Sequence, residues 1–285
     1  MPIMARGDLS EAMESLLGDC AGDGSAFDFC RRHVGTYVCS HYEDLHPGIS
    51  SRMPESAGSV ARLLERGVKL LGNGEIGGPV LDIGCSVGRA TFELAQAFTG
   101  PVLGIDLNFS MLKTAAAVLR RSEIEYPRRR EGVVYERVRF PVNFDHTGRA
   151  DFWVCDAAAL PFADDAFSLA ASLNVLDCVW SPYHHLQELS RVLQTGAKAI
   201  ISTPYDWTSS ATPIEAWLGG HSQRSEHKGS GASVLRAFLE SGDSPEQIKR
   251  LEMVREEDAE WTLRLYDRSY MKYITRLMVL RKKAL

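Results

Sequence analysis

Short apolar runs and amphipathic segments alternate through most of this chain. Short apolar runs bounded by turn residues are typical of buried strands, and they predict strands at 80–83, 101–106, 152–155, 166–172 and 198–204. Between these runs, apolar residues recur at three- and four-residue spacing, which indicates helices. The predicted helices lie at 59–71, 90–98, 110–121 and 182–193. Because strands and helices alternate, we expect an α/β fold with a doubly wound, mostly parallel sheet.

The two ends of the chain depart from this alternation. Residues 251–257 and 269–281 resemble a closing pair of antiparallel strands after a short helix at 233–240, which completes a seven-stranded sheet. Apolar positions at helical spacing over 8–46 predict helices ahead of the first strand. The expected organisation is an N-terminal helical cap at 1–72 and a main domain at 73–285, with insertions at about 120–150 and 208–231.

The composition is that of an ordinary globular protein. Of 285 residues, 45% are hydrophobic and 24% are charged, and the formal net charge of −5 gives no reason to expect nucleic acid or an anionic membrane as a partner. No apolar run approaches the roughly 20 residues that span a bilayer. The six cysteines include no C-x-x-C pair, which argues against a zinc site or a disulfide framework. The sequence therefore predicts a reduced, cytoplasmic protein without a metal site.

The insertion at about 120–150 is rich in arginine. Its arginines are Arg120, Arg121, Arg128, Arg129, Arg130, Arg137, Arg139 and Arg149. We expect a solvated hairpin through Val133 to Phe140, because charge runs usually lie on solvated faces. The alternative is a contact with an acidic substrate or with a second copy of the chain, which would make the protein a homodimer.

The strongest chemical signal is the segment Val80-Leu81-Asp82-Ile83-Gly84-Cys85-Ser86-Val87-Gly88-Arg89. A strand that ends in a glycine turn and opens a helix can cradle a ligand, because glycines allow close backbone approach and the helix start offers free N–H groups. The spacing does not fit the dinucleotide fingerprint G-x-G-x-x-G. It resembles D/E-x-G-x-G-x-G, motif I of the class I S-adenosylmethionine-dependent methyltransferases, with Ser86 in place of the middle glycine.

Two further acids follow in the order that this family shows. Asp106 ends the second strand, where the resemblance implies that it accepts the ribose hydroxyls of the cofactor. Asp156 opens Asp-Ala-Ala-Ala-Leu-Pro-Phe, which resembles the adenine-binding turn of the family. The resemblance implies S-adenosyl-L-methionine as the cofactor. The implied cofactor-binding residues are Asp82, Gly84, Cys85, Gly88, Asp106, Leu107, Asp156, Ala157 and Asn174.

The segment after the fourth strand resembles a narrower group. Asn174-Val175-Leu176-Asp177, together with the T-P-Y-D-W and T-P-x-x-x-W-L-G-G blocks within 203–220, is similar to protein-histidine N-methyltransferases and to the C-terminal methyltransferase domain of ovothiol biosynthesis enzymes. The implied catalytic residues are Asn174, Asp177 and Tyr205. The residues expected to contact the acceptor are Tyr37, His41, Trp207, Trp217 and His221.

These observations favour methylation of a small molecule, at a nitrogen of a histidine-like or other amino-acid-derived acceptor. One alternative keeps the methyl transfer and changes the acceptor to an oxygen or carbon of a specialised metabolite, or to a histidine in a protein. Another class of function is a catalytically silent protein that keeps the fold for binding or scaffolding. The His184-His185 pair is expected on a helix surface, since adjacent helical residues point to different faces.

Overall fold

The computed structural model describes residues 3–4, 26–48, 56–74, 76–239, 248 and 250–284. The strands are β1 (Ile3–Met4), β2 (Val80–Ile83), β3 (Val102–Asp106), β4 (Glu123–Glu131), β5 (Val134–Pro141), β6 (Ala150–Val154), β7 (Phe167–Leu173), β8 (Leu193–Thr203), β9 (Leu251–Tyr266) and β10 (Ser269–Lys282). The α-helices are α2 (Ala26–Tyr42), α3 (Ser59–Leu71), α4 (Arg89–Ala97), α5 (Phe109–Arg121), α6 (Pro182–Val192) and α7 (Gly231–Leu239). Short 3-10 helices lie at Glu43–Leu45, Thr147–Arg149 and Ile214–Ala216.

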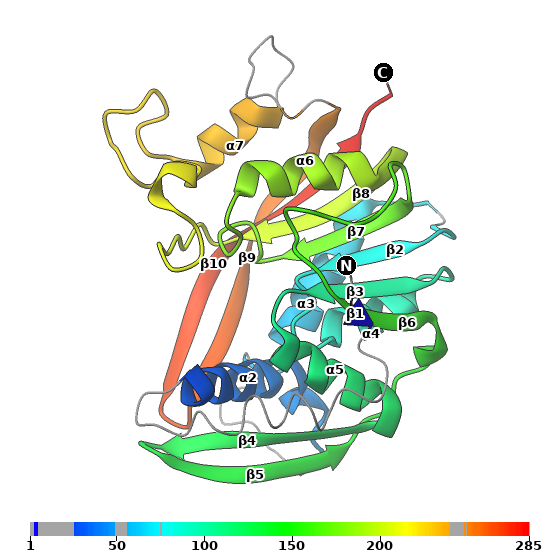
Figure 1. Cartoon of the computed structure of the whole chain (residues 1–285), viewed down its shortest axis with the longest axis vertical. Coiled ribbons are helices and arrows are strands. Elements are labelled where there is room, and N and C mark those ends of the chain that lie inside the picture. Colours follow the sequence, from blue (N-terminus) through cyan, green and yellow to red (C-terminus); the bar gives the residue numbers. More distant parts are fainter. Residues whose placement is uncertain are drawn as a thin grey trace.

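The main sheet has the strand order β1-β6-β3-β2-β7-β8-β10-β9 (Figure 1). Strands β6, β3, β2, β7 and β8 are parallel, whereas β10 runs antiparallel to both β8 and β9. The predicted doubly wound sheet with a closing hairpin is therefore confirmed, and the two-residue β1 adds an antiparallel strand at the edge beside β6. The chain reverses its winding direction at β2, and open α/β sheets bind ligands at such a switch point.

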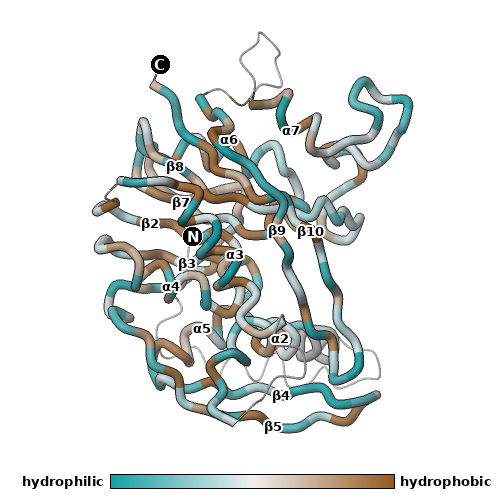
Figure 2. Tube along the Cα trace, turned by 180° about the vertical axis from the view of Figure 1, so that it is seen from behind, coloured by the Kyte–Doolittle hydropathy of each residue, from teal (hydrophilic) through white to brown (hydrophobic). Residues whose placement is uncertain are grey.

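Two hydrophobic cores lie on opposite faces of this sheet. Val80 of β2 packs in the core with α3, α4 and α5, whereas Leu81 and Ile83 pack in the core with α6 and α7. All of β2 is buried, as expected for a strand covered on both faces. Figure 2 shows the apolar residues concentrated in the central strands between the helices.

The closing hairpin is longer than the sequence pattern predicted. Strand β9 continues to Tyr266, well past the expected end at residue 257, and only Arg276–Arg281 of β10 pairs with β8. The remainder of the hairpin projects past the sheet toward α2 (Figure 1). There Trp261 and Leu263 join the same core as Val38 and Tyr42 of α2, so packing on this helix supports the extra length.

Helix α2 lies between the projecting hairpin and the β4-β5 hairpin (Figure 1). Buried Glu43, just past its end, accepts hydrogen bonds from Arg264 of β9 at 2.7 Å and from Arg128 of β4 at 3.2 Å. Part of the predicted cap, including residues 8–25, lies outside the described residues. Helix α3 packs on β8, β9 and β10 as part of the main domain's helical layer.

The arginine-rich insertion forms the predicted hairpin, with β4 paired to β5 over Glu123–Pro141. Its arginines are matched by acids of the same chain: Arg130 and Arg128 pair with Glu136, and Arg139 pairs with Glu123. The pairs of Arg130 and Arg139 are exposed and add little stability, whereas Arg128 is half-buried and also binds Glu43. All three arginine side chains are therefore already partnered. Within the part of the chain described here, no helix is long and apolar enough to cross a membrane.

The turn between β2 and α4 requires glycine. Gly84 and Gly88 have φ values of +70° and +88°, which side-chain-bearing residues rarely adopt. A Cβ atom at Gly88 would lie 2.7 Å from Cβ of Ala115 and 2.9 Å from the ring of Phe152. This turn is therefore packed directly against α5 and β6.

Substituting Gly88 with Ala should destabilise the fold by about 2–3 kcal/mol, because backbone strain and overpacking act in the same direction. Denaturant unfolding measures this change. Gly148→Ala is the matched control, since a Cβ atom there meets nothing within 4 Å, and it should change stability by less than about 0.5 kcal/mol. Equal stability of the two variants would contradict the packing argument.

Candidate active site

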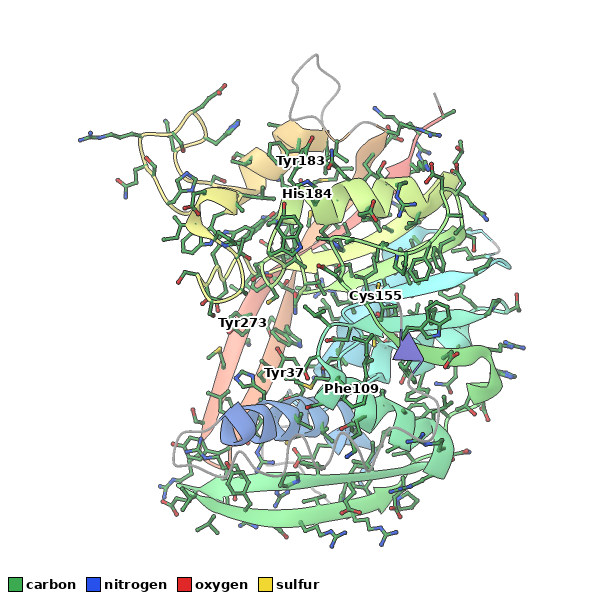
Figure 3. The ribbon with its side chains drawn as sticks, viewed as in Figure 1. Tyr37, Phe109, Cys155, Tyr183, His184 and Tyr273 are labelled. Carbon is green, nitrogen blue, oxygen red and sulfur yellow. The ribbon has the colours of Figure 1, made fainter. Side chains whose placement is uncertain are left out.

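A cavity of about 820 Å³ lies at the carboxyl ends of β2, β3, β6 and β7. Its lining comes from helices α2, α3, α4 and α5, from the turns after β2, β3 and β6, from the segment after β7, from the insertion after β8 and from β9. The lining residues include His33, Tyr37, His41, Asp82, Gly84, Cys85, Ser86, Asp106, Leu107, Asn108, Phe109, Cys155, Asp156, Ala157, Asn174, Cys178, Trp180, Ser210, Ala211 and Trp261. Figure 3 shows Tyr37, Phe109 and Cys155 approaching this region from α2, α5 and the end of β6.

The glycine turn forms one wall of this strand-end cavity. Asp82 is buried beneath it, and its Oδ2 accepts a hydrogen bond of 2.6 Å from Oγ1 of Thr91. Burial raises the pKa of Asp82 to about 7. Ser86, at the middle glycine position of the motif, has a φ of +53°, the left-handed region that glycine adopts without strain.

Asp106 at the end of β3 is held by backbone N–H groups. Its Oδ2 accepts from Ser86 at 2.8 Å, and its Oδ1 accepts from Asn108 at 2.7 Å. Burial raises the pKa of Asp106, although these bonds favour the carboxylate. Each oxygen keeps a further lone pair, so the carboxylate can accept two hydroxyl groups of a ligand in the cavity.

Asp156 opens the turn after β6. Its Oδ1 accepts from the backbone N–H of Ala158 at 2.8 Å, and its Oδ2 accepts from Nε1 of Trp180 at 3.1 Å. The carbonyl oxygen of Ala157 lies 3.1 Å from Nδ1 of His185, a fully buried residue. The expectation of an exposed histidine pair is therefore wrong for His185, because its ring ties α6 to this turn, and holds for His184.

Asn174 follows β7 with a φ of +54°. Its Oδ1 accepts from Oγ of Ser202 at 2.8 Å and from Oγ1 of Thr275 at 2.7 Å. Because both hydroxyls donate to its oxygen, the amide NH2 group of Asn174 stays available as a donor. No described group of the protein bonds to it, and the residue lines the cavity.

The other predicted catalytic residues do not line the cavity. Asp177 is buried, with Oδ1 accepting from Oγ1 of Thr203 at 3.1 Å and Oδ2 accepting from the backbone N–H of Asp206 at 2.9 Å. Its carboxylate therefore holds the segment after β8. Tyr205 packs beside Gly231 at the beginning of α7, with its hydroxyl buried.

Of the residues predicted to contact the acceptor, some line the cavity and others do not. Tyr37 and His41 of α2 line the cavity, with ring centroids 5.7 Å apart. Trp207, Trp217 and His221 do not line it. The two indoles stack on each other at 6.3 Å, and His221 is exposed. The insertion instead reaches the cavity through Ser210 and Ala211.

His41 is held in its neutral form. It is 4% exposed and its Nδ1 has no hydrogen-bond partner among the described groups. Burial, followed by the nearby charge of Arg89, lowers the pKa of His41 to about 3. Its carbonyl oxygen accepts from Arg89 at 2.7 Å, and the next residue, Tyr42, donates to the carbonyl of Val87 in the glycine turn at 2.7 Å. The end of α2 is thereby fixed beside that turn.

Sequence reasoning missed several lining residues. Trp180 lies just before the proline that begins α6, and Trp261 lies within a β9 extension that the pattern did not predict. Trp180 could have been found only as an aromatic residue in the segment after β7, whereas Trp261 lies in the interior of β9, where no strand-end pattern points to it. Gly88, predicted to bind the cofactor, does not line the cavity and instead allows the close packing described above. Among the described residues, no cluster of His, Cys, Asp and Glu can hold a metal ion.

Substituting Asp82 with Asn tests the buried carboxyl group. Because its pKa rises from 3.8 to about 7, the folded state holds the proton more tightly than the unfolded state. This contribution is complete below about pH 4 and is lost as the pH rises through about 7. The free energy of unfolding of the wild type, relative to Asp82→Asn, should fall by about 2–4 kcal/mol over that range in denaturant titrations without cofactor. A difference that does not change with pH would contradict this assignment.

Comparison with known proteins supports the fold and the domain. Residues 81–201 match the family model described as "Methyltransferase domain". Methyltransferase GfsG of Streptomyces halstedii is 24% identical over 196 residues, covering 65% of this chain and 63% of the relative. The 2-phytyl-1,4-naphtoquinone methyltransferase of Nostoc punctiforme is 34% identical over 128 residues, covering 44% of this chain and 46% of the relative. The chain thus spans less than two thirds of the length of these relatives.

Among solved structures, the cyclase SpnF has a TM-score of 0.53 and 16% identity, covering 90% of this chain and 93% of that chain. At this identity the likeness shows the fold alone. The match from β2 to β8, the strand order and the glycine turn agree with one another. Residues 81–201 therefore resemble a methyltransferase domain, and the chain has the α/β, Rossmann-like fold of such domains.

Proposed function

We propose that this chain transfers the methyl group of S-adenosylmethionine to a small-molecule acceptor. The observation that carries the proposal is the arrangement of Asp106: two backbone N–H groups fix its carboxylate at a strand end, beside the glycine turn and inside a cavity of about 820 Å³. A half-buried carboxylate held in this way can accept hydrogen bonds from paired hydroxyl groups of a ligand, such as those of a ribose.

The residues around the cavity fit the cofactor. Gly84 lines the cavity, and no side chain fits at this position because a Cβ atom there would lie 2.3 Å from the side chain of Val175. Asp106 would accept the ribose hydroxyls, and Asp156 would accept from the adenine amino group. When bound, the cofactor supplies a methyl group activated by a positively charged sulfur. The protein then has to position the acceptor and exclude water.

For the acceptor, we propose a nitrogen of a histidine-like or other amino-acid-derived compound. The nitrogen lone pair forms the new N–C bond as the S–C bond breaks. An imidazole acceptor then loses the proton of its other ring nitrogen to solvent, and an amine acceptor loses a proton from the methylated nitrogen. A neutral ring nitrogen already carries the attacking lone pair, so it needs no strong base. An acceptor that needs no strong base suits this cavity, because His41 has a low pKa and the carboxylate of Asp177 accepts a hydrogen bond from the backbone of Asp206.

Asn174 is the proposed orienting group for that acceptor. Its free amide NH2 group donates, so it would bind a carbonyl or carboxylate oxygen, or a ring nitrogen, of the acceptor. Tyr37 and Trp261 would provide aromatic walls from α2 and β9. Asp177 would act indirectly, as a positioning residue that fixes the segment after β8.

A second candidate acceptor is the carbon or oxygen of an aromatic specialised metabolite. The name of the Nostoc punctiforme relative, a naphtoquinone methyltransferase, and the aromatic lining favour it. The two acceptor classes differ in what they require, because a hydroxyl group must lose its proton to become a good nucleophile.

Asp106→Ala should weaken binding of S-adenosylhomocysteine by about 2–3 kcal/mol, the range for lost hydrogen bonds to a charged group. Titration calorimetry measures the dissociation constant. The exposed Asp145→Ala is the control and should bind as the wild type does. Unchanged affinity of Asp106→Ala, or tight binding of a nicotinamide cofactor to the wild type, would overturn the cofactor assignment.

A panel of histidine derivatives, other amino acids and aromatic metabolites, assayed with labelled S-adenosylmethionine, tests the acceptor. Turnover of an imidazole acceptor should rise between about pH 6 and pH 8 as its ring loses a proton. Asn174→Ala should lower kcat/KM by about 10–100-fold, the equivalent of a lost hydrogen bond in the transition state. Exposed Asn143→Ala is the control.

Methylation of only oxygen or carbon acceptors would exclude the histidine-like class and keep the methyltransferase assignment. Normal turnover by Asn174→Ala would remove its proposed role. Binding of the cofactor without transfer to any acceptor would favour the silent alternative.

A further inference from the structure

We propose that Trp180 forms one wall of the adenine site and orients Asp156 toward the adenine amino group. This inference rests on the proposed binding of S-adenosylmethionine. It assigns a ligand contact to a residue outside the methyltransferase motifs, in the segment between β7 and α6.

The indole of Trp180 borders the strand-end cavity and contacts Asp156. The side chain lines the cavity, and its Nε1–H donates to Oδ2 of Asp156 at 3.1 Å. The residue is 48% exposed, which is unusual for so large an apolar side chain. A half-exposed indole at a cavity wall offers a flat apolar surface for a planar ligand.

One face of this indole is already covered. The ring of His184 stacks on it with centroids 5.0 Å apart and an interplanar angle of 29°. His184 is itself fixed, because its Nδ1 lies 2.7 Å from Oγ of Ser181, the residue that caps α6. Figure 3 shows His184 at the beginning of α6, on the side of the sheet's strand ends where Cys155 lies. Since His184 backs one face, the opposite face is the one left for a ligand.

The same contact sets what Asp156 can recognise. One oxygen accepts from the backbone of Ala158 and the other accepts from Trp180, so the carboxylate is held in place by two donors. An ionised carboxylate only accepts hydrogen bonds. It therefore favours a purine with an amino group at position 6 and disfavours one with a carbonyl oxygen there.

These contacts predict two separable contributions. The ring face of Trp180 contributes stacking, which for a nucleobase is worth about 1–3 kcal/mol, or roughly 5- to 150-fold in affinity. The N–H group contributes selectivity for the amino group through Asp156. Phenylalanine keeps much of the first contribution and loses the second, whereas alanine loses both.

The experiment measures binding of three probes by calorimetry: S-adenosylhomocysteine, methylthioadenosine and S-inosylhomocysteine. Methylthioadenosine lacks the amino-acid end, and S-inosylhomocysteine carries a carbonyl oxygen in place of the adenine amino group. The variants are Trp180→Ala and Trp180→Phe. Trp153→Phe is the matched control, because its indole N–H also donates to an aspartate, Asp151 at 3.4 Å, but it lies outside the cavity.

We expect Trp180→Ala to weaken binding of S-adenosylhomocysteine and methylthioadenosine alike, by about 10–50-fold. Trp180→Phe should bind S-adenosylhomocysteine within about 5-fold of the wild type, and its preference over S-inosylhomocysteine should shrink. Binding should quench the tryptophan fluorescence of the wild type and of Trp153→Phe, but much less that of Trp180→Phe.

Wild-type or tighter binding by Trp180→Ala would overturn this inference alone, as would an unchanged preference in Trp180→Phe. A wild-type protein that binds neither adenosine probe would overturn the proposed function, and this inference with it.

Discussion

The candidate site depends on backbone N–H groups that hold carboxylates at the strand ends. Asp106 is fixed by Ser86 and Asn108, and Asp156 is fixed by Ala158. Hydrogen bonds from oriented N–H groups to a charged acceptor are strong. These bonds offset part of the free-energy cost of removing the carboxylate from water. The acids are therefore in place before any ligand binds, and both line one cavity.

A second set of contacts joins the two sides of this cavity. Buried Glu43 binds Arg264 of β9 at 2.7 Å, and Arg89 of α4 binds Asp44 at 2.9 Å. Removing one partner of such a pair leaves an unpaired buried charge, which is costly. The end of α2 is thus tied both to the projecting hairpin and to the helix that follows the glycine turn. The wall of the cavity at the glycine turn and its wall at β9 are therefore both in contact with the end of this helix.

The sequence alone determined most of the fold and the proposed cofactor side of the cavity. Strand β2, the glycine turn, Asp106 and Asp156 were predicted because each depends on local pattern: apolar runs, turn residues and an acid at a strand end. The helix at Ser59–Leu71 and the β4-β5 hairpin were predicted for the same reason. Carboxyl ends of parallel strands must meet at one edge, so local information was enough to bring these acids together.

Only the tertiary structure decided the acceptor side. Asp177 and Trp180 stand three positions apart in the same segment, and nothing in their spacing shows that Asp177 turns inward to bond Asp206 while Trp180 turns to the cavity. The length of β9 was likewise unpredictable, because its extension is stabilised by packing on α2, more than 200 residues earlier in the chain. Such choices depend on which distant groups compete for a side chain, and that competition exists only once the chain is folded.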